Sequence, residues 1–99
     1  MKKGDCFLIH GQIVLRERAD FLLCHGTVEG TGGEVKGERY SHAWIEINGI
    51  VIDQSNKHNL VCRKKEYYEV GKVKDVKRYN REEVMEMTDK SENWGPWHE

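Results

Sequence analysis

A histidine and an aspartate lie on either side of the clearest turn signal in this sequence. The segment HAWIEINGIVID, residues 42–53, predicts a β-hairpin, because Asn48-Gly49 is typical of a two-residue type I′ turn. In that register Ile47 pairs with Ile50, and the alternation of side chains places His42 and Asp53 on one face. These two residues are then diagonal neighbours, with Cβ atoms roughly 7 Å apart. An imidazole oriented by a carboxylate is the base half of a catalytic triad, so a nucleophile is expected nearby.

The sequence contains three cysteines that could act as this nucleophile. Cys6 lies in the first turn of a predicted helix, where the helix dipole favours the reactive thiolate. Cys24 lies within a predicted strand and is expected to be a small buried core residue. Cys62 lies in a charged, loop-like stretch without an evident partner. We therefore predict a catalytic site made of Cys6, His42 and Asp53.

Each of these residues also has an ordinary structural interpretation. Cys6 can be a buried thiol, His42 a strand histidine bonded to a neighbour, and Asp53 a cap for the polar loop over residues 55–59. His10 is an alternative base, because it follows Cys6 by four residues on the same helix face. Trp44 shares the predicted face of His42, where it either shields the site or belongs to the core.

The elements that must hold these residues predict an α+β domain. Asp5 is an expected N-cap for a helix over residues 6–18. Cys6, Ile9 and Ile13 fall on one face of this helix, which should point at a sheet.

The rest of the chain predicts an antiparallel sheet followed by a second helix. Strands are expected over residues 21–28, 39–47, 50–54, 66–70 and 73–79, with a glycine-rich connection over residues 29–37. Asn80 is expected to cap a last helix over residues 81–90, with Glu83 completing a capping box. Trp94 and Trp97 are expected to pack on the domain. The sequence thus predicts a single domain over residues 1–99, with an N-terminal helix that carries Cys6 on a small antiparallel sheet and a C-terminal helix.

Composition excludes some classes of partner. The chain has 99 residues and a net charge of -1, which argues against a general nucleic-acid binder. The basic stretch Arg63–Arg78 is interrupted by acidic residues and is interpreted as a solvated strand edge. No stretch is long enough to span a membrane, and the N-terminus lacks the apolar run and cleavage site of a signal peptide. We expect a cytoplasmic protein with free thiols that binds neither nucleic acid nor membrane.

A zinc site is a second interpretation of the histidines and cysteines. Suitable ligand types occur at six positions: Cys6, Cys24, His25, His42, His58 and Cys62. Structural zinc sites usually show short paired spacings such as C-x-x-C, and this sequence has none. Cys24 and His25 would also point to opposite faces of their strand. We therefore expect neither a metal nor another cofactor.

The order Cys6, His42, Asp53, with the cysteine at a helix start and the other two on successive strands, resembles the papain-like cysteine hydrolase superfamily. HAWIE followed by VID is similar to the His and Asp strands of transglutaminase-like proteins. The size and element order are similar to those of NlpC-type peptidases and amidases. The resemblance spans about residues 5–56, and Phe7 follows Cys6 where many papain relatives carry tryptophan.

This resemblance implies a cysteine peptidase or amidase. Cys6 would attack a carbonyl carbon as a thiolate, His42 would move the proton to the leaving amine, and Asp53 would orient the imidazole. The Cys6 backbone N–H and one further donor would hold the oxyanion. By residue type, the further donor is one of Gln12, His25, Tyr40 and Gln54.

The implied partner is a peptide or amide substrate. Peptidoglycan stem peptides, protein amides and small conjugates all stay open, and so does acyl transfer to an amine in place of hydrolysis. The alternative function is a non-enzymatic binding module on the same fold. In that case Tyr67-Tyr68 and the tail from Trp94 to Trp97 could belong to an interface, although plain packing also accounts for them.

Overall fold

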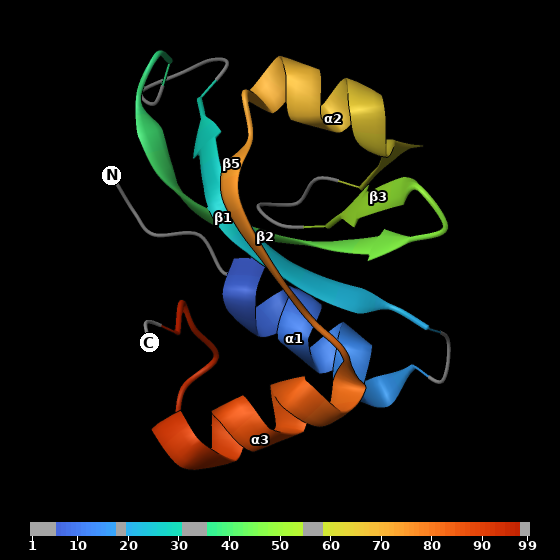
Figure 1. Ribbon diagram of the computed structural model, residues 1–99, viewed down its shortest axis with the longest axis vertical. Helices are drawn as coiled ribbons and strands as arrows, with labels where there is room; N and C mark the ends of the chain where they lie inside the picture. Colours follow the sequence, from blue (N-terminus) through green and yellow to red (C-terminus); the bar gives the residue numbers. More distant parts are fainter. Residues whose placement is uncertain (1–5, 18–19, 31–35, 55–58, 98–99) are drawn as a thin grey trace.

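A five-stranded antiparallel sheet forms the centre of the molecule (Figure 1). The computed structural model describes residues 6–17, 20–30, 36–54 and 59–97. Along the chain the elements are α1 (Cys6–Arg16), β1 (Leu22–Glu29), β2 (Arg39–Ile47), β3 (Ile50–Asp53), β4 (Leu60–Arg63), α2 (Lys64–Gly71), β5 (Lys74–Tyr79) and α3 (Arg81–Ser91). In the sheet the strand order is β4-β3-β2-β1-β5. The predicted α+β class is confirmed, with one helix before the small antiparallel sheet along the chain and another helix after it.

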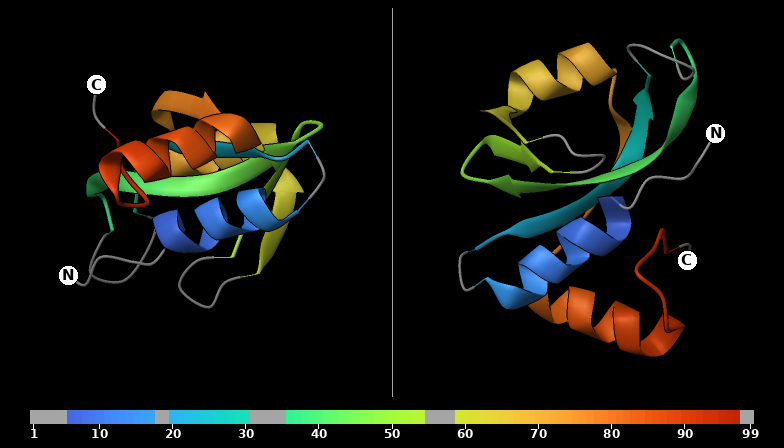
Figure 2. Two further views of the ribbon diagram at one scale, coloured as in Figure 1. Left: turned by 90° about the horizontal axis from the view of Figure 1, so that it is seen from below. Right: turned by 180° about the vertical axis from the view of Figure 1, so that it is seen from behind.

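The two faces of the sheet bury different sets of side chains, and α1 and α3 lie on the face opposite α2 (Figures 1 and 2). Ala43 and Ile45 pack toward α1 and α3. Trp44 and Val51 pack toward α2. This alternation agrees with the faces predicted for the hairpin. None of the helices in the described ranges is long and apolar enough to cross a membrane.

The hairpin that joins β2 to β3 forms as predicted. Asn48 and Gly49 have φ angles of +49° and +77°, which suit the two central positions of a type I′ turn. Ile47 pairs with Ile50, and the antiparallel register continues to Ile45 opposite Ile52. The turn therefore fixes the register that carries His42 and Asp53 toward each other.

The predicted strand over residues 66–70 is wrong, because this segment lies within the helix α2. Tyr67, Tyr68 and Val70 favour strands by type, but none of the residues of α2 is fully buried, and its contacts to the sheet decide its conformation. Cys62 lies in the strand β4, opposite Val51, and not in a loop. The basic stretch from residue 63 to residue 78 therefore spans a strand end, a helix and the edge strand β5 in place of one strand edge.

The remaining elements agree closely with expectation. α1 begins at Cys6 and ends at Arg16, two residues before the expected end. α3 has the predicted capping box, in which the Asn80 side chain accepts from the Glu83 backbone and the Glu83 side chain accepts from the Asn80 backbone. The expected N-cap Asp5 and most of the two expected loops lie outside the described residues.

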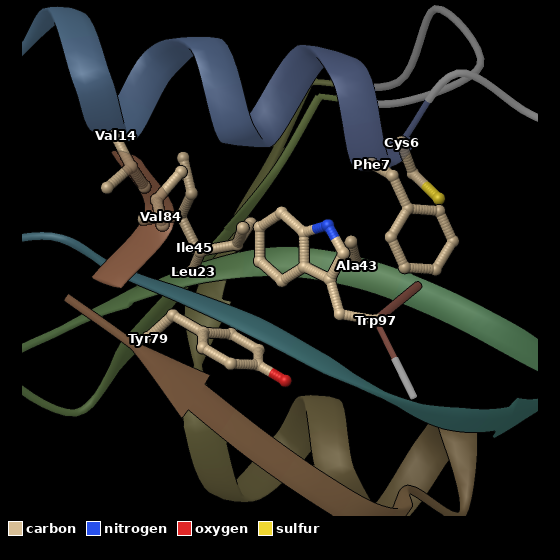
Figure 3. Packing of buried hydrophobic residues seen from close by; sticks show 9 residues of the cluster. All are labelled: Cys6, Phe7, Val14, Leu23, Ala43, Ile45, Tyr79, Val84 and Trp97. Carbon is tan, nitrogen blue, oxygen red and sulfur yellow. The ribbon is translucent and has the colours of Figure 1, made fainter. Parts of the chain in front are cut away.

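The C-terminal segment returns from the end of α3 to α1, as expected for a tail with two tryptophans (Figure 2). Trp97 is 4% exposed and lies in the core beside Phe7 and Ala43 (Figure 3). Trp94 lies against Gly11 so closely that a Cβ at Gly11 would be 2.7 Å from the Trp94 Cε3 atom. The glycine within α1 is therefore the place where this ring approaches the helix backbone.

We predict that Gly11→Ala lowers the free energy of unfolding, although alanine favours a helix by about 1 kcal/mol over glycine. The added methyl group would force the Trp94 ring or α1 to move, and overpacking of this kind costs ~1–3 kcal/mol. Urea denaturation measures the difference. In a Trp94→Ala background the same substitution should become stabilising. A Gly11→Ala protein that is more stable than wild type with Trp94 present would contradict this packing.

Candidate active site

His42 and Asp53 form a buried pair at one end of the hairpin. The His42 Nε2 atom on β2 lies 2.9 Å from the Asp53 Oδ2 atom on β3. The same carboxylate oxygen accepts a 2.8 Å hydrogen bond from the Tyr67 hydroxyl of α2. His42 is 6% exposed and Asp53 8% exposed, so little water screens the interaction.

Cys6 joins this pair from α1. Its side chain is close enough to His42 to raise the pKa of that imidazole, and Cys6 is 4% exposed. Because Asp53 engages Nε2 of the imidazole, Nδ1 is the nitrogen that remains for the thiol. The structure thus brings together the three residues of the predicted site from three separate elements, in the order thiol, imidazole, carboxylate.

The surroundings of His42 change its acid–base behaviour. Burial lowers the pKa of His42, but hydrogen bonds to Asp53 and to Cys6 and the charges of both groups outweigh burial and raise the pKa to about 9. The imidazole is therefore protonated at neutral pH. An imidazolium beside a thiol favours the thiolate, which is the nucleophilic form.

His10 is fully buried in α1, and both of its ring nitrogens are engaged. Nε2 accepts a 2.9 Å hydrogen bond from the backbone N–H of Gln54, so this nitrogen carries no proton. Nδ1 therefore holds the proton and donates it to the Cys6 carbonyl at 2.8 Å. Nε2 also lies 3.7 Å from the Asp53 Oδ1 atom. In this arrangement His10 is a neutral link between the nucleophile helix and the end of β3, which argues against the alternative in which it is the base.

Two aromatic rings of β2 enclose the imidazole of His42. The Trp44 ring stacks near it at 6.1 Å between centroids, and the Tyr40 ring meets it edge-on at 5.9 Å. Trp44 is fully buried in the core on the α2 side, so it supports the imidazole and does not cover the site as a mobile shield. On β1 the residue opposite His42 is Gly26, where a Cβ would lie 2.8 Å from the Trp44 ring.

Of the four side chains considered as a second oxyanion donor, Tyr40 has its ring beside that of His42. Burial, followed by the nearby charges of Asp53 and Cys6, raises the pKa of Tyr40. Gln12 is exposed on α1, and the exposed side chain of Gln54 is directed to Asn59, 3.4 Å away. His25 lies among aromatic side chains on the other face of the sheet.

The other two cysteines differ from Cys6. Cys24 is fully buried, as expected, and burial together with the charge of Glu46 raises its pKa strongly. Cys62 is half-buried, and burial raises its pKa as well. All three thiols are free. Within the described ranges, which exclude His58, no group of three or more His, Cys, Asp or Glu residues is placed to hold a metal ion.

The sequence interpretation missed α2 as part of the site. Its two adjacent tyrosines reach the two buried carboxylates of the hairpin: Tyr67 donates to Asp53, and Tyr68 donates to Glu46. Glu46 also accepts a 3.0 Å bond from the Trp44 indole and a 2.9 Å bond from Arg78. A prediction of a helix over this segment would have pointed to these contacts. The two consecutive tyrosines of α2 reach Asp53 and Glu46 from that helix.

Comparisons with protein-family models, with curated proteins and with solved structures give no match to this chain. The geometry of the site itself is therefore the basis for a proposed function.

We predict that Asp53→Asn lowers the pKa of His42 from about 9, because the hydrogen bond and the negative charge of the carboxylate, which both raise it, are lost while burial still lowers it. The chemical shift of the His42 ring protons, followed by NMR against pH, measures this directly.

The raised pKa of His42 also means that its pair with Asp53 stabilises the fold below about pH 6.5 and loses this effect as pH rises through about 9. Asp89→Asn, at an exposed position of α3, is the matched control and should leave His42 unchanged. An unaltered His42 titration in Asp53→Asn would disprove the pairing.

His10→Leu should lower the free energy of unfolding by about 1 kcal/mol or more, because it leaves the partly buried Gln54 N–H without its acceptor. His10→Gln should recover part of this loss, since the amide oxygen of glutamine can accept the same N–H. Urea denaturation of the three proteins gives the comparison. Equal stability of His10→Leu and wild type would show that the link is energetically unimportant.

Proposed function

We propose that this protein is a cysteine hydrolase of the papain-like type, a peptidase or amidase that uses Cys6, His42 and Asp53. The observation that carries the proposal is the His42 imidazole held between two partners. Its Nε2 atom lies 2.9 Å from the Asp53 carboxylate, and the Cys6 thiol is close enough to raise the pKa of the ring. A nucleophile, a base and a group that orients the base are the parts that acyl transfer requires.

The proposed reaction begins with Cys6 as a thiolate next to protonated His42, whose pKa of about 9 supports this state at neutral pH. The sulfur attacks the carbonyl carbon of the amide, and the electron pair moves onto the carbonyl oxygen. The Cys6 backbone N–H is available to this oxyanion, because the first N–H groups of a helix have no partner within the helix. The Tyr40 hydroxyl is the proposed second donor.

Collapse of the tetrahedral intermediate breaks the carbon–nitrogen bond, and His42 gives its proton to the leaving amine. Neutral His42 then takes a proton from water, which attacks the thioester and releases the acid and the Cys6 thiolate. An amine that takes the place of water would give acyl transfer by the same steps. Asp53 holds the imidazole in one orientation throughout, through its contact with Nε2.

The proposal is tested by the reactivity of Cys6 compared with the other two thiols in the same molecule. The three cysteines fall in three different tryptic peptides, so mass spectrometry reports on each separately. Iodoacetamide should alkylate Cys6 rapidly at pH 6, where an ordinary thiol with a pKa of about 8.5 is almost wholly protonated. Half-buried Cys62 is the internal control and should react only at higher pH. His42→Ala should reduce the reaction of Cys6 at pH 6 to that of Cys62.

A second measurement separates a hydrolase from a binding module on the same fold. With p-nitrophenyl acetate as the probe, Cys6 should release p-nitrophenolate, carry the acetyl group as a thioester, and lose it to water. Asp53→Asn should slow both acylation and deacylation. A Cys6 that reacts no faster than Cys62 at pH 6, or that takes up no acetyl group, would reject the hydrolase and favour the binding module.

A further inference from the structure

His25 on β1 is a buried histidine whose ring nitrogens have no hydrogen-bond partner within the described residues. Its side chain points away from Cys24 and the α2 side, and it lies on the face that α1 covers. Three aromatic rings surround it, with centroid distances of 4.7 Å to Phe7, 5.1 Å to Tyr79 and 4.9 Å to Trp97. A buried polar group without a partner destabilises the fold, so such a position calls for a physical reason.

The C-terminal segment from Asn93 to Trp97 closes this aromatic enclosure. A Cβ at Gly95 would lie 2.6 Å from the His25 Cε1 atom and 3.2 Å from the Phe7 ring, so the backbone of the segment lies directly on the imidazole. The Trp97 indole N–H donates to the Asn93 carbonyl at 3.1 Å, which closes the segment on itself. The residues of this segment, Asn93 to Trp97, include no charged side chain.

Both burial and the charge near His25 disfavour a proton on its ring. Burial, followed by the charge of Lys77 on the neighbouring strand β5, lowers the pKa of His25 to about 4. From α1 the facing group is Phe7, from β5 it is Tyr79 and from the tail it is Trp97, and none of them is charged at neutral pH. When the segment lifts, water reaches the imidazole, and its pKa returns toward the ordinary 6.5.

We propose that the C-terminal segment Asn93–Trp97 is a latch over α1 that opens in acid, with His25 as its proton sensor. The docked latch favours neutral His25, because its buried ring nitrogens have no hydrogen-bond partner among the described residues and the nearby charge of Lys77 opposes a proton. The open latch accepts the proton in water. Below about pH 6.5 the docking equilibrium therefore falls by up to roughly tenfold per pH unit, until about pH 4.

The latch also has a route to the candidate active site, and this second part rests on the proposed function. Gly95 contacts Phe7, the residue after Cys6, and Trp94 lies on Gly11, the residue after His10. The segment thus holds the first two turns of the helix that positions the thiol. Opening should loosen Cys6 relative to His42, and so lower its reactivity in acid.

The test uses the indole N–H resonances of the full chain in ¹H–¹⁵N spectra from pH 7.5 to 4.5. The resonances of Trp94 and Trp97 should move or exchange faster with solvent below pH 6.5, with docking weakened about a hundredfold by pH 4.5. The Trp44 indole, bonded to Glu46 on the other face of the sheet, is the internal reference and should stay fixed. His25→Leu fills the same space without a titrating group, and the transition should vanish in it. His25→Phe is the second variant if leucine disturbs folding.

A wild-type protein in which the tail indoles behave like Trp44 down to pH 4.5 would overturn the latch without any variant. A transition that persists in His25→Leu or in His25→Phe would also overturn it, because another group would then be the sensor. The alkylation of Cys6 at pH 5 is measured in parallel. A transition in the indoles with no reactive Cys6 at any pH would keep the latch and reject the proposed function, so the two failures are distinguishable.

Discussion

The buried carboxylate of Asp53 is the interaction on which the arrangement of this molecule depends. A carboxylate that leaves water needs close donors, and removing them costs several kcal/mol. The donors come from separate parts of the chain: His42 from β2 and Tyr67 from α2. Each of these elements must therefore dock at the end of β3 for the charge to be satisfied. The candidate catalytic pair and the assembly of the fold depend on the same group.

A second buried carboxylate explains why α2 is a helix and why it stays on the sheet. Glu46 accepts from the Trp44 indole, the Tyr68 hydroxyl and the Arg78 side chain, and these bonds lower its pKa although burial acts to raise it. None of the residues of α2 is fully buried, so apolar packing alone holds this helix weakly. Its adjacent tyrosines contact the two carboxylates, and hydrogen bonds to charged groups are worth about 1.5–3 kcal/mol each. The ionised states of Asp53 and Glu46 thus hold α2 against the strands.

The parts of the structure that could be predicted from sequence are those that local rules determine. The Asn48-Gly49 turn and the alternation of β2 and β3 were enough to place His42 beside Asp53, and the capping residues of α3 identified its start. The helix α2 could not be predicted in this way, because its tyrosines are favoured in strands until the two carboxylates are in place. The role of His10 could not be predicted either. It depends on how α1 lies across the end of β3, which no local pattern specifies.

Two histidines with opposite shifts define the pH range in which the proposed site can work. His42 keeps its proton up to about pH 9, because a carboxylate and a thiol lie beside it, and above that pH the imidazolium that supports the thiolate is lost. His25 rejects a proton down to about pH 4, because it is buried among aromatic rings and a lysine lies nearby. The proposed alkaline limit is thus a property of the site, whereas the proposed acid limit is a property of the tail packed against α1. Histidine can set both the acid and the alkaline limit because its pKa depends on its surroundings. Burial alone lowers the pKa of a histidine, and a nearby carboxylate or thiolate reverses that effect.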